Sequence, residues 1–113
     1  MDTEKPIAWL GSSLNDLLQF PANIKRELGY DLSLIQAGRE PRDYKPMPSL
    51  GSGILEIRVK DSHGAFRLVY VARMKNHIYV LHTFQKKTQK TAPKDTALIR
   101  QRYRMMQETE NEA

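Results

Sequence analysis

The first third of the chain carries apolar residues at helical spacing. Three leucines share one face of a short segment that Ser12-Ser13 can cap as a helix. These leucines are Leu14, Leu17 and Leu18. Pro21 suits the first turn of a second helix, and Gly38 stands where a glycine ends one. The apolar positions between them are Ile24, Leu28, Leu32 and Ile35. The pattern predicts a helical hairpin with one apolar side, and core packing explains that side better than a ligand site does.

From Ile54 the period changes to the two residues of a β-strand. Apolar positions alternate with Glu56, Arg58 and Lys60, and Asp61-Ser62-His63-Gly64 then has the composition of a hairpin turn. Residues 66–73 and 77–84 are the expected second and third strands. The third strand, IYVLHTF, is apolar almost throughout, so we expect it to be central and covered on both faces. A short edge strand over residues 44–47 also fits the sequence, because proline is tolerated at edges.

A last helix is expected to begin near Pro93, with Ile99, Tyr103 and Met106 on one stripe. The order of elements predicts an α+β fold, in which an N-terminal helical hairpin packs on a small, mainly antiparallel twisted sheet with a C-terminal helix. A chain of 113 residues suggests a single domain, residues 1–113. The acidic tail, residues 108–113, is expected to be flexible.

Charge favours a polyanionic partner. The formal net charge is +5. Residues 86–104 contain seven cations and a single acid, Asp95. These cations are Lys86, Lys87, Lys90, Lys94, Arg100, Arg102 and Arg104. RNA, DNA or anionic lipid would suit this balance, and a solvated basic surface is the simpler alternative. The sequence has no cysteine, no secretory signal pattern and no apolar run of the roughly 18 residues that a membrane span needs. We therefore expect a cytoplasmic protein without membrane contact.

The cations of the first two long strands allow two interpretations. Glu56, Arg58 and Lys60 share one strand face, and Arg67 on the next strand reaches Arg58 if the register permits. With Glu56 as counter-ion, the group is a solvated salt-bridge ladder. Without it, two arginines side by side are a clamp for phosphate, which guanidinium groups bind bidentately. Composition alone slightly favours the ladder.

Histidines and lysines supply the remaining chemistry. His82 on its apolar strand is either a packed core residue or a proton donor and acceptor near neutral pH. His63 and His77 lack a second ligand at useful spacing, so a metal site is not expected. Lys86 and Lys87 should splay to opposite sides at the strand end. The residues expected to touch RNA backbone are Lys45, Lys60, Arg73, Lys86 and Lys90.

Taken together, these segments resemble the RelE/HigB superfamily of toxins, in its phage-derived HigB-like branch. The resemblance runs roughly from Ile7 to Met106 and is carried by Gly51-x-Gly53, Leu55-Glu56-Ile57-Arg58, Phe66-Arg67-Leu68-Val69-Tyr70 and the stretch LHTFQKKT from Leu81 to Thr88. It implies a type II toxin that enters the ribosomal A site and cleaves mRNA there. It also implies a helix-turn-helix, HigA-like antitoxin that binds operator DNA, and no cofactor or metal.

Metal-free cleavage of RNA uses the ribose 2′-OH as nucleophile and needs a base, an acid and cations for the phosphorane. The resemblance assigns Arg58 and Arg67 to the phosphorane charge. Lys86 or Lys87 would hold the backbone or protonate the leaving group, and His82 or Glu56 would be the base. Where some superfamily members have a catalytic Tyr or His near the C-terminus, this chain offers only Tyr103, within a helix.

Two other functions remain open on the sequence. One is a non-catalytic module that uses the same cations to bind RNA, a ribosome surface or a repressor partner. The other is a phage structural or accessory protein, for which the sequence offers little.

Overall fold

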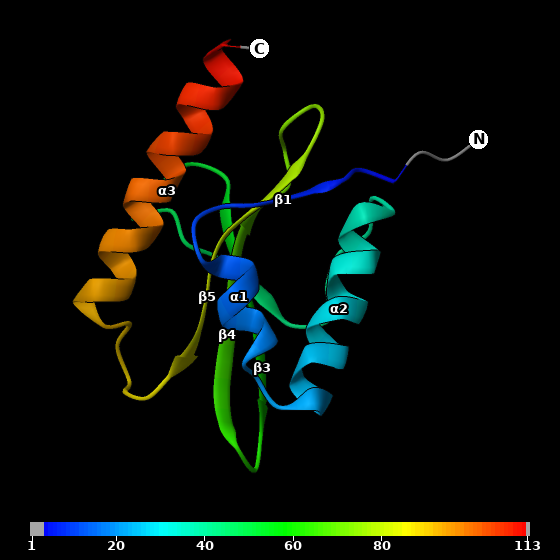
Figure 1. Ribbon diagram of the computed structural model, residues 1–113, viewed down its shortest axis with the longest axis vertical. Helices are drawn as coiled ribbons and strands as arrows, with labels where there is room; N and C mark the ends of the chain where they lie inside the picture. The colour runs from blue at the N-terminus through cyan, green and yellow to red at the C-terminus, as the bar shows by residue number, and fades with distance from the viewer. Residues whose placement is uncertain (1–3, 113) are drawn as a thin grey trace.

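A computed structural model describes residues 4–112 and shows helices on both faces of a five-stranded sheet (Figure 1). The helices are α1 (Ser13–Leu18), α2 (Ala22–Gln36) and α3 (Pro93–Glu112). The strands are β1 (Ile7–Trp9), β2 (Tyr44–Pro46), β3 (Ile54–Asp61), β4 (Gly64–Val71) and β5 (Ile78–Lys86). The order across the sheet is β1-β5-β4-β3-β2. None of these helices is both long enough and apolar enough to cross a bilayer.

The helical hairpin is confirmed, but the predicted core packing of its first helix is wrong for two leucines: Leu17 is buried, whereas Leu14 and Leu18 are 37% and 52% exposed. Its capping also differs in one place. Pro21 immediately precedes α2, and Gly38 follows its end with φ +80°, a conformation that favours glycine. Ser12 precedes α1, but its hydroxyl does not bond a free backbone N–H of the helix. The hydroxyl donates instead to the Asp16 carboxylate at 2.8 Å. The prediction that Ser12 caps α1 through its side chain is therefore wrong.

The sheet is mainly antiparallel, as the sequence predicted, but it also contains one parallel pair, which the sequence did not predict. Strands β2, β3, β4 and β5 pair antiparallel, whereas β1 pairs parallel with β5 from Ile7↔Ile78 to Trp9↔Val80. Three residues after Pro6 are too few to show a two-residue period, so the pattern gave no sign of this strand. The parallel neighbour β1 leaves β5 flanked on both sides.

Apolar side chains form one core on each face of the sheet. Residues of α1 and α2 pack on one face against residues such as Ile57, Leu68 and Val80. Residues of α3 pack on the other face against Val69, Leu81 and their neighbours. Every β5 residue from Ile78 to Phe84 is buried, so the expectation that this strand is covered on both faces is confirmed.

A β-bulge in β5 changes which way His82 faces. Tyr70 pairs with Val80 and Val69 pairs with His82, which leaves Leu81 as the extra residue. Strict alternation from Val80 would turn His82 toward α1 and α2. Because of the bulge, His82 lies opposite Val69 and faces α3.

Helix α3 is longer than the sequence suggested and leaves part of its sheet face open. It continues through the acidic tail to Glu112, and Glu110 accepts a hydrogen bond from the Tyr79 hydroxyl at 2.5 Å. Burial, with this hydrogen bond, raises the pKa of Tyr79 to about 12.

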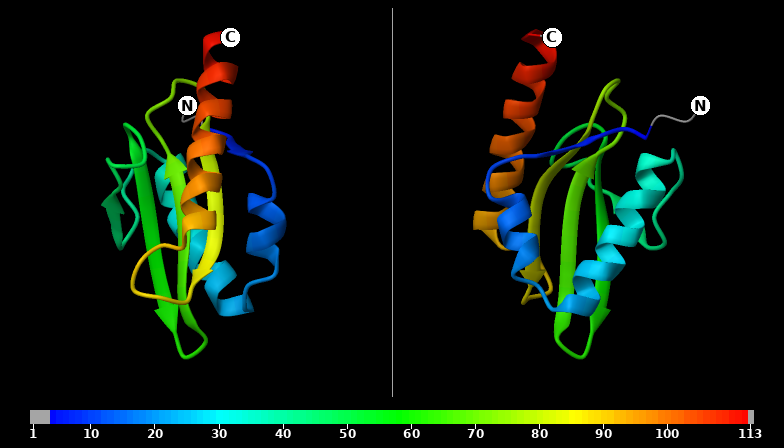
Figure 2. Two further views of the ribbon diagram at one scale, coloured as in Figure 1. Left: turned by 90° about the vertical axis from the view of Figure 1, so that its left-hand side faces the viewer. Right: turned by 45° about the vertical axis from the view of Figure 1, so that its right-hand side comes forward.

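The N-terminal end of α3 begins beside the middle of the sheet, and the β3–β4 hairpin extends beyond it (Figure 2).

Candidate nucleic-acid interface

The register of β3, β4 and β5 brings four cations together on the uncovered end of the sheet. Arg58 lies directly opposite Arg67, while Ala65 lies between Lys60 and Lys86. Side chains directly opposite one another share a face, with Cβ atoms about 4.5–5.5 Å apart. Arg58, Lys60, Arg67 and Lys86 therefore form one surface on the α3 side of the sheet, which we call the basic face.

Each arginine of the basic face has its own carboxylate. Arg58 Nη2 lies 3.1 Å from Asp43 Oδ1, and both side chains are largely exposed, at 39% and 58%. Arg67 Nε lies 3.6 Å from Glu56 Oε1, and these side chains are only 13% and 2% exposed. Exposed pairs contribute little, about 0–1 kcal/mol, so a phosphate can replace Asp43 at Arg58. The sequence suggested Glu56 as the counter-ion and gave no indication of Asp43.

Glu56 is placed behind Arg67, away from solvent. Its Oε2 has no hydrogen-bond partner in the described residues, and neither has Arg67 Nε, because 3.6 Å exceeds hydrogen-bond distance. The Arg67 Nη1 group donates to the Phe66 carbonyl at 3.2 Å. Glu56 is therefore a buried counter-ion for Arg67 in this conformation, and its predicted role as a base is untested.

His82 is held by hydrogen bonds at both ring nitrogens. Nε2 lies 2.7 Å from Asp95 Oδ1, and Arg102 Nη1 lies 3.1 Å from Nδ1. Because a guanidinium only donates, Nδ1 accepts and the ring proton on Nε2 goes to Asp95. The ring also stacks on Phe84, with centroids 5.0 Å apart. His82 thus sits as a packed core residue, and its predicted role as a catalytic base also remains untested.

Arg102 extends this network to the N-terminal part of the chain. It donates to the Leu81 carbonyl at 3.0 Å and to Ser12 Oγ at 3.1 Å, although its side chain is almost fully buried. Gly11, with φ +55°, makes room for it, since a Cβ there would lie 2.5 Å from Arg102 Nε. The sequence did carry a signal that was missed: Arg102 follows Ile99 by three residues and so lies on the apolar stripe of α3.

A cleft of about 510 Å³ adjoins the basic face between α1, the end of β5 and the start of α3. Lys86 and Lys87 both line it, although they follow one another at the strand end. Lys90 and Lys94 line it from the connection to α3 and from the first turn of that helix. The sequence-predicted Lys87 and Lys90 are therefore next to the basic face.

With this geometry in view, comparison with known proteins gives one family. The model of the family described as Phage derived protein Gp49-like (DUF891) matches residues 15–104. The chain belongs to the Gp49-like family. Gp49-like proteins are commonly toxins of toxin–antitoxin pairs, and the family suggests an antitoxin as partner. No curated protein matches the sequence.

The match to the Gp49-like family spans all of the basic face and all of the residues that line the cleft. It contains Arg58, Arg67, His82 and Arg102, and it leaves out β1 and the end of α3. In the part of this Gp49-like chain that the structure describes, no three His, Asp or Glu side chains gather as metal ligands would.

Two of the predicted RNA contacts lie apart from the basic face. Lys45 pairs with Glu56 from the edge strand β2, so it is on the same side of the sheet but at its border. Arg73 lies beyond the end of β4, six residues from Arg67, or about 20 Å along an extended strand. It donates to the Ser52 carbonyl and to the Tyr103 hydroxyl. Arg73 is therefore at the opposite end of the sheet.

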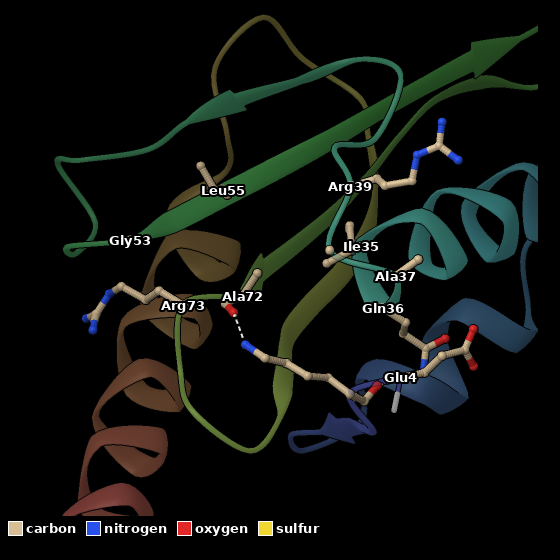
Figure 3. Close-up of a pocket in the computed structure, with 11 residues that line it drawn as sticks. Glu4, Ile35, Gln36, Ala37, Arg39, Gly53, Leu55, Ala72 and Arg73 are labelled. Carbon is tan, nitrogen blue, oxygen red and sulfur yellow. Dashed lines mark hydrogen bonds between the residues drawn. The ribbon is translucent and has the colours of Figure 1, made fainter. Parts of the chain in front are cut away.

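Arg73 instead borders a second cavity, of about 710 Å³, at the C-terminal end of α2. Figure 3 shows Arg73 and Arg39 on opposite sides of it, with Ile35, Leu55 and Ala72 between. Lys5 Nζ donates to the Ala72 carbonyl at 2.8 Å within it. Neither the basic face nor the Arg102 network contributes a residue to this cavity.

Proposed function

We propose that this Gp49-like protein is the toxin of a RelE/HigB-type toxin–antitoxin pair and cleaves mRNA in the ribosomal A site. The observation that supports it best is the Arg58–Arg67 pair on an uncovered sheet end, beside Lys60 and Lys86. Two guanidinium groups on adjacent strands fit one phosphodiester with bidentate hydrogen bonds. The reaction takes place in the cytoplasm, and the inhibitory partner is a helix-turn-helix antitoxin that also binds operator DNA.

In the proposed reaction the ribose 2′-OH attacks the adjacent phosphorus and the 5′-oxygen departs. Arg67 is held by a buried carboxylate, so its charge is fixed before RNA arrives. Fixed charges aimed at a developing phosphorane are usually the largest single contribution to catalysis. Arg58 exchanges its exposed contact with Asp43 for a phosphate oxygen. The arginine pair then stabilises the transition state from two neighbouring strands.

Proton transfer is assigned to groups around the arginine pair. Lys86 or Lys87 protonates the leaving oxygen and holds the RNA backbone, because both lie at the border of the basic face and the cleft. The candidate bases, His82 and Glu56, are both buried. Either of them acts only if binding to the ribosome or the RNA exposes it, which is compatible with catalytic contacts that tighten only in the complex.

The test is 5′-end mapping of cellular mRNA after a short pulse of expression, with Arg67→Ala beside the wild type. We expect cuts within translated codons for the wild type and none for Arg67→Ala. Arg26→Ala is the matched control, because Arg26 is exposed on α2, against the other face of the sheet. Intact mRNA and normal growth with a folded wild-type protein would refute the proposal.

The second candidate is a module of the same fold that binds RNA or the ribosome without cutting. The burial of both candidate bases is the observation that favours it. Ribosome co-sedimentation of Arg67→Ala separates the two functions. Retained binding with lost cleavage supports catalysis, whereas parallel loss of binding, with no cleavage in the wild type, supports the binding module.

A further inference from the structure

The cleft beside the basic face contains an excess of unpaired positive charge. Lys86, Lys87, Lys90 and Lys94 line it, and within residues 4–112 none of them forms an ion pair. Two carboxylates, Asp16 and Asp95, also line the cleft. Because cations concentrate here without partners, the cleft attracts an anion.

Both carboxylates are already engaged by the protein. Asp16 Oδ2 accepts from Ser12 Oγ at 2.8 Å, and Asp95 Oδ1 is 2.7 Å from His82 Nε2. Neither lies within ion-pair distance of a cleft lysine. The lysines therefore remain available to a ligand from outside.

Three large apolar side chains also line the cleft, and we call them its floor. These are Phe20, Phe84 and Leu98. Gln19 at the end of α1 is exposed, and its side-chain amide makes no hydrogen bond within the described residues. An apolar floor with one free amide and surrounding cations combines what a base and its phosphates require.

We propose that this cleft binds one nucleotide of single-stranded RNA, with its phosphates on the lysines and its base on the apolar floor. The substrate class rests on the proposed function. Phe84 links the two places, since it lines the cleft and lies directly opposite Arg67. The nucleotide in the cleft is thus a neighbour of the one whose phosphate lies on Arg58 and Arg67. A volume of about 510 Å³ lies within the range of small-ligand sites, about 300–1,000 Å³.

The Arg102 network holds the cleft in shape. It joins α1 through Ser12, β5 through Leu81 and His82, and α3, from which Arg102 itself comes. Those are the three elements between which the cleft opens. The site is therefore largely formed before RNA binds, which lowers the ordering cost of binding.

Fluorescence anisotropy with a short, labelled 2′-O-methyl RNA tests the cleft directly, because this probe has no free 2′-OH and cannot be cut. The double variant Lys90→Ala/Lys94→Ala should weaken binding roughly tenfold and reduce the salt slope by about 1.4, or about 0.7 for each lost phosphate contact. Both lysines are exposed, so the fold should be unaffected. The control Arg26→Ala/Lys75→Ala removes the same charge from exposed sites elsewhere.

Base recognition is tested with Gln19→Ala on oligo(U), oligo(C) and oligo(A) probes of the same chemistry. We expect the ratio of affinities among the probes to change several-fold while the salt slope stays constant, since Gln19 carries no charge. An unchanged ratio would overturn the assignment of the base to the cleft. Equal affinity of the lysine double variant and its control would overturn the site as a whole.

The proposed nucleotide site in the cleft and the proposed nuclease function can be refuted independently. If the wild type cuts mRNA and depends on Arg67, but the double lysine variant binds RNA like its control, the cleft inference is wrong. If the wild type does not cut, but the lysine variant loses affinity and Gln19→Ala alters base preference, the cleft stands and the nuclease proposal is wrong.

Discussion

Replacing Arg102 with methionine should cost the protein a large share of its stability. Arg102 is only 7% exposed, and its guanidinium makes three hydrogen bonds of 3.0–3.1 Å, to Leu81, His82 and Ser12. Methionine keeps the apolar stem and removes every donor. The Leu81 carbonyl and His82 Nδ1 are buried, and each acceptor that loses its partner costs about 1–3 kcal/mol. We therefore expect a loss of about 2–6 kcal/mol, compared with about 5–15 kcal/mol for a whole domain.

Urea unfolding is the assay, with the fluorescence of Trp9, the only tryptophan, as the local probe and circular dichroism as the global one. Arg100→Met is the matched control, because Arg100 lies on the same helix and is exposed. Its effect should stay within about 0.5 kcal/mol. If Arg102→Met falls within about 1 kcal/mol of Arg100→Met at equal m-value, the buried network is not a major source of stability and the reasoning is refuted.

Gly11 provides an independent check on the position of Arg102. Alanine there would place Cβ 2.5 Å from Arg102 Nε and would also strain a backbone with φ +55°. In an Arg102→Ala background the clash disappears and only the backbone strain, about 1–2 kcal/mol, remains. A double-mutant cycle should therefore show a coupling of at least about 1 kcal/mol, and simple additivity would place Arg102 elsewhere.

Three further outcomes are expected. Hydrogen bonds from Asn23 and His63 lower the pKa of Asp61 to about 2. The stability that this carboxylate provides is present above about pH 4 and lost as pH falls toward 2, so acid titration of Asp61→Asn should show a flatter decline than the wild type. Asp43→Ala should tighten RNA binding several-fold in the anisotropy assay, because Arg58 loses an exposed competitor; weaker binding would exclude Arg58 as a phosphate contact. Met106→Ala should cost about 2–5 kcal/mol in urea unfolding, because Met106 is fully buried; a smaller loss would mean that the site collapses.

Local sequence signals were sufficient to predict the long helices and strands and the contact between Arg58 and Arg67. The turn after Asp61 closes at Gly64, and this two-residue connection sets Arg58 against Arg67. The spacing of apolar residues likewise located both long helices and the three long strands. These features depend on residues that are close together in the chain, so the local sequence pattern predicts them.

The remaining features depend on partners that are distant in the sequence. Strand β1 is defined by its pairing with β5 about 70 residues later, and the β5 bulge by its register against β4. Asp43 reaches Arg58 only because β2 lies beside β3. No periodicity within a single segment carries such information, and His82 consequently faces α3 rather than the side that alternation implies.

The pairing of β1 with β5 also sets a delay during synthesis. Ile7 emerges from the ribosome 71 residues before its partner Ile78, which at roughly 5–20 residues per second is about 4–14 s. Through that interval an apolar strand with a tryptophan has no neighbour, and a cell must shield it from other nascent chains. A similar delay applies to the cleft, because its third wall, α3, follows β5 in the chain. The cleft can therefore form only after the residues of α3 that line it, Lys94, Asp95 and Leu98, have been made.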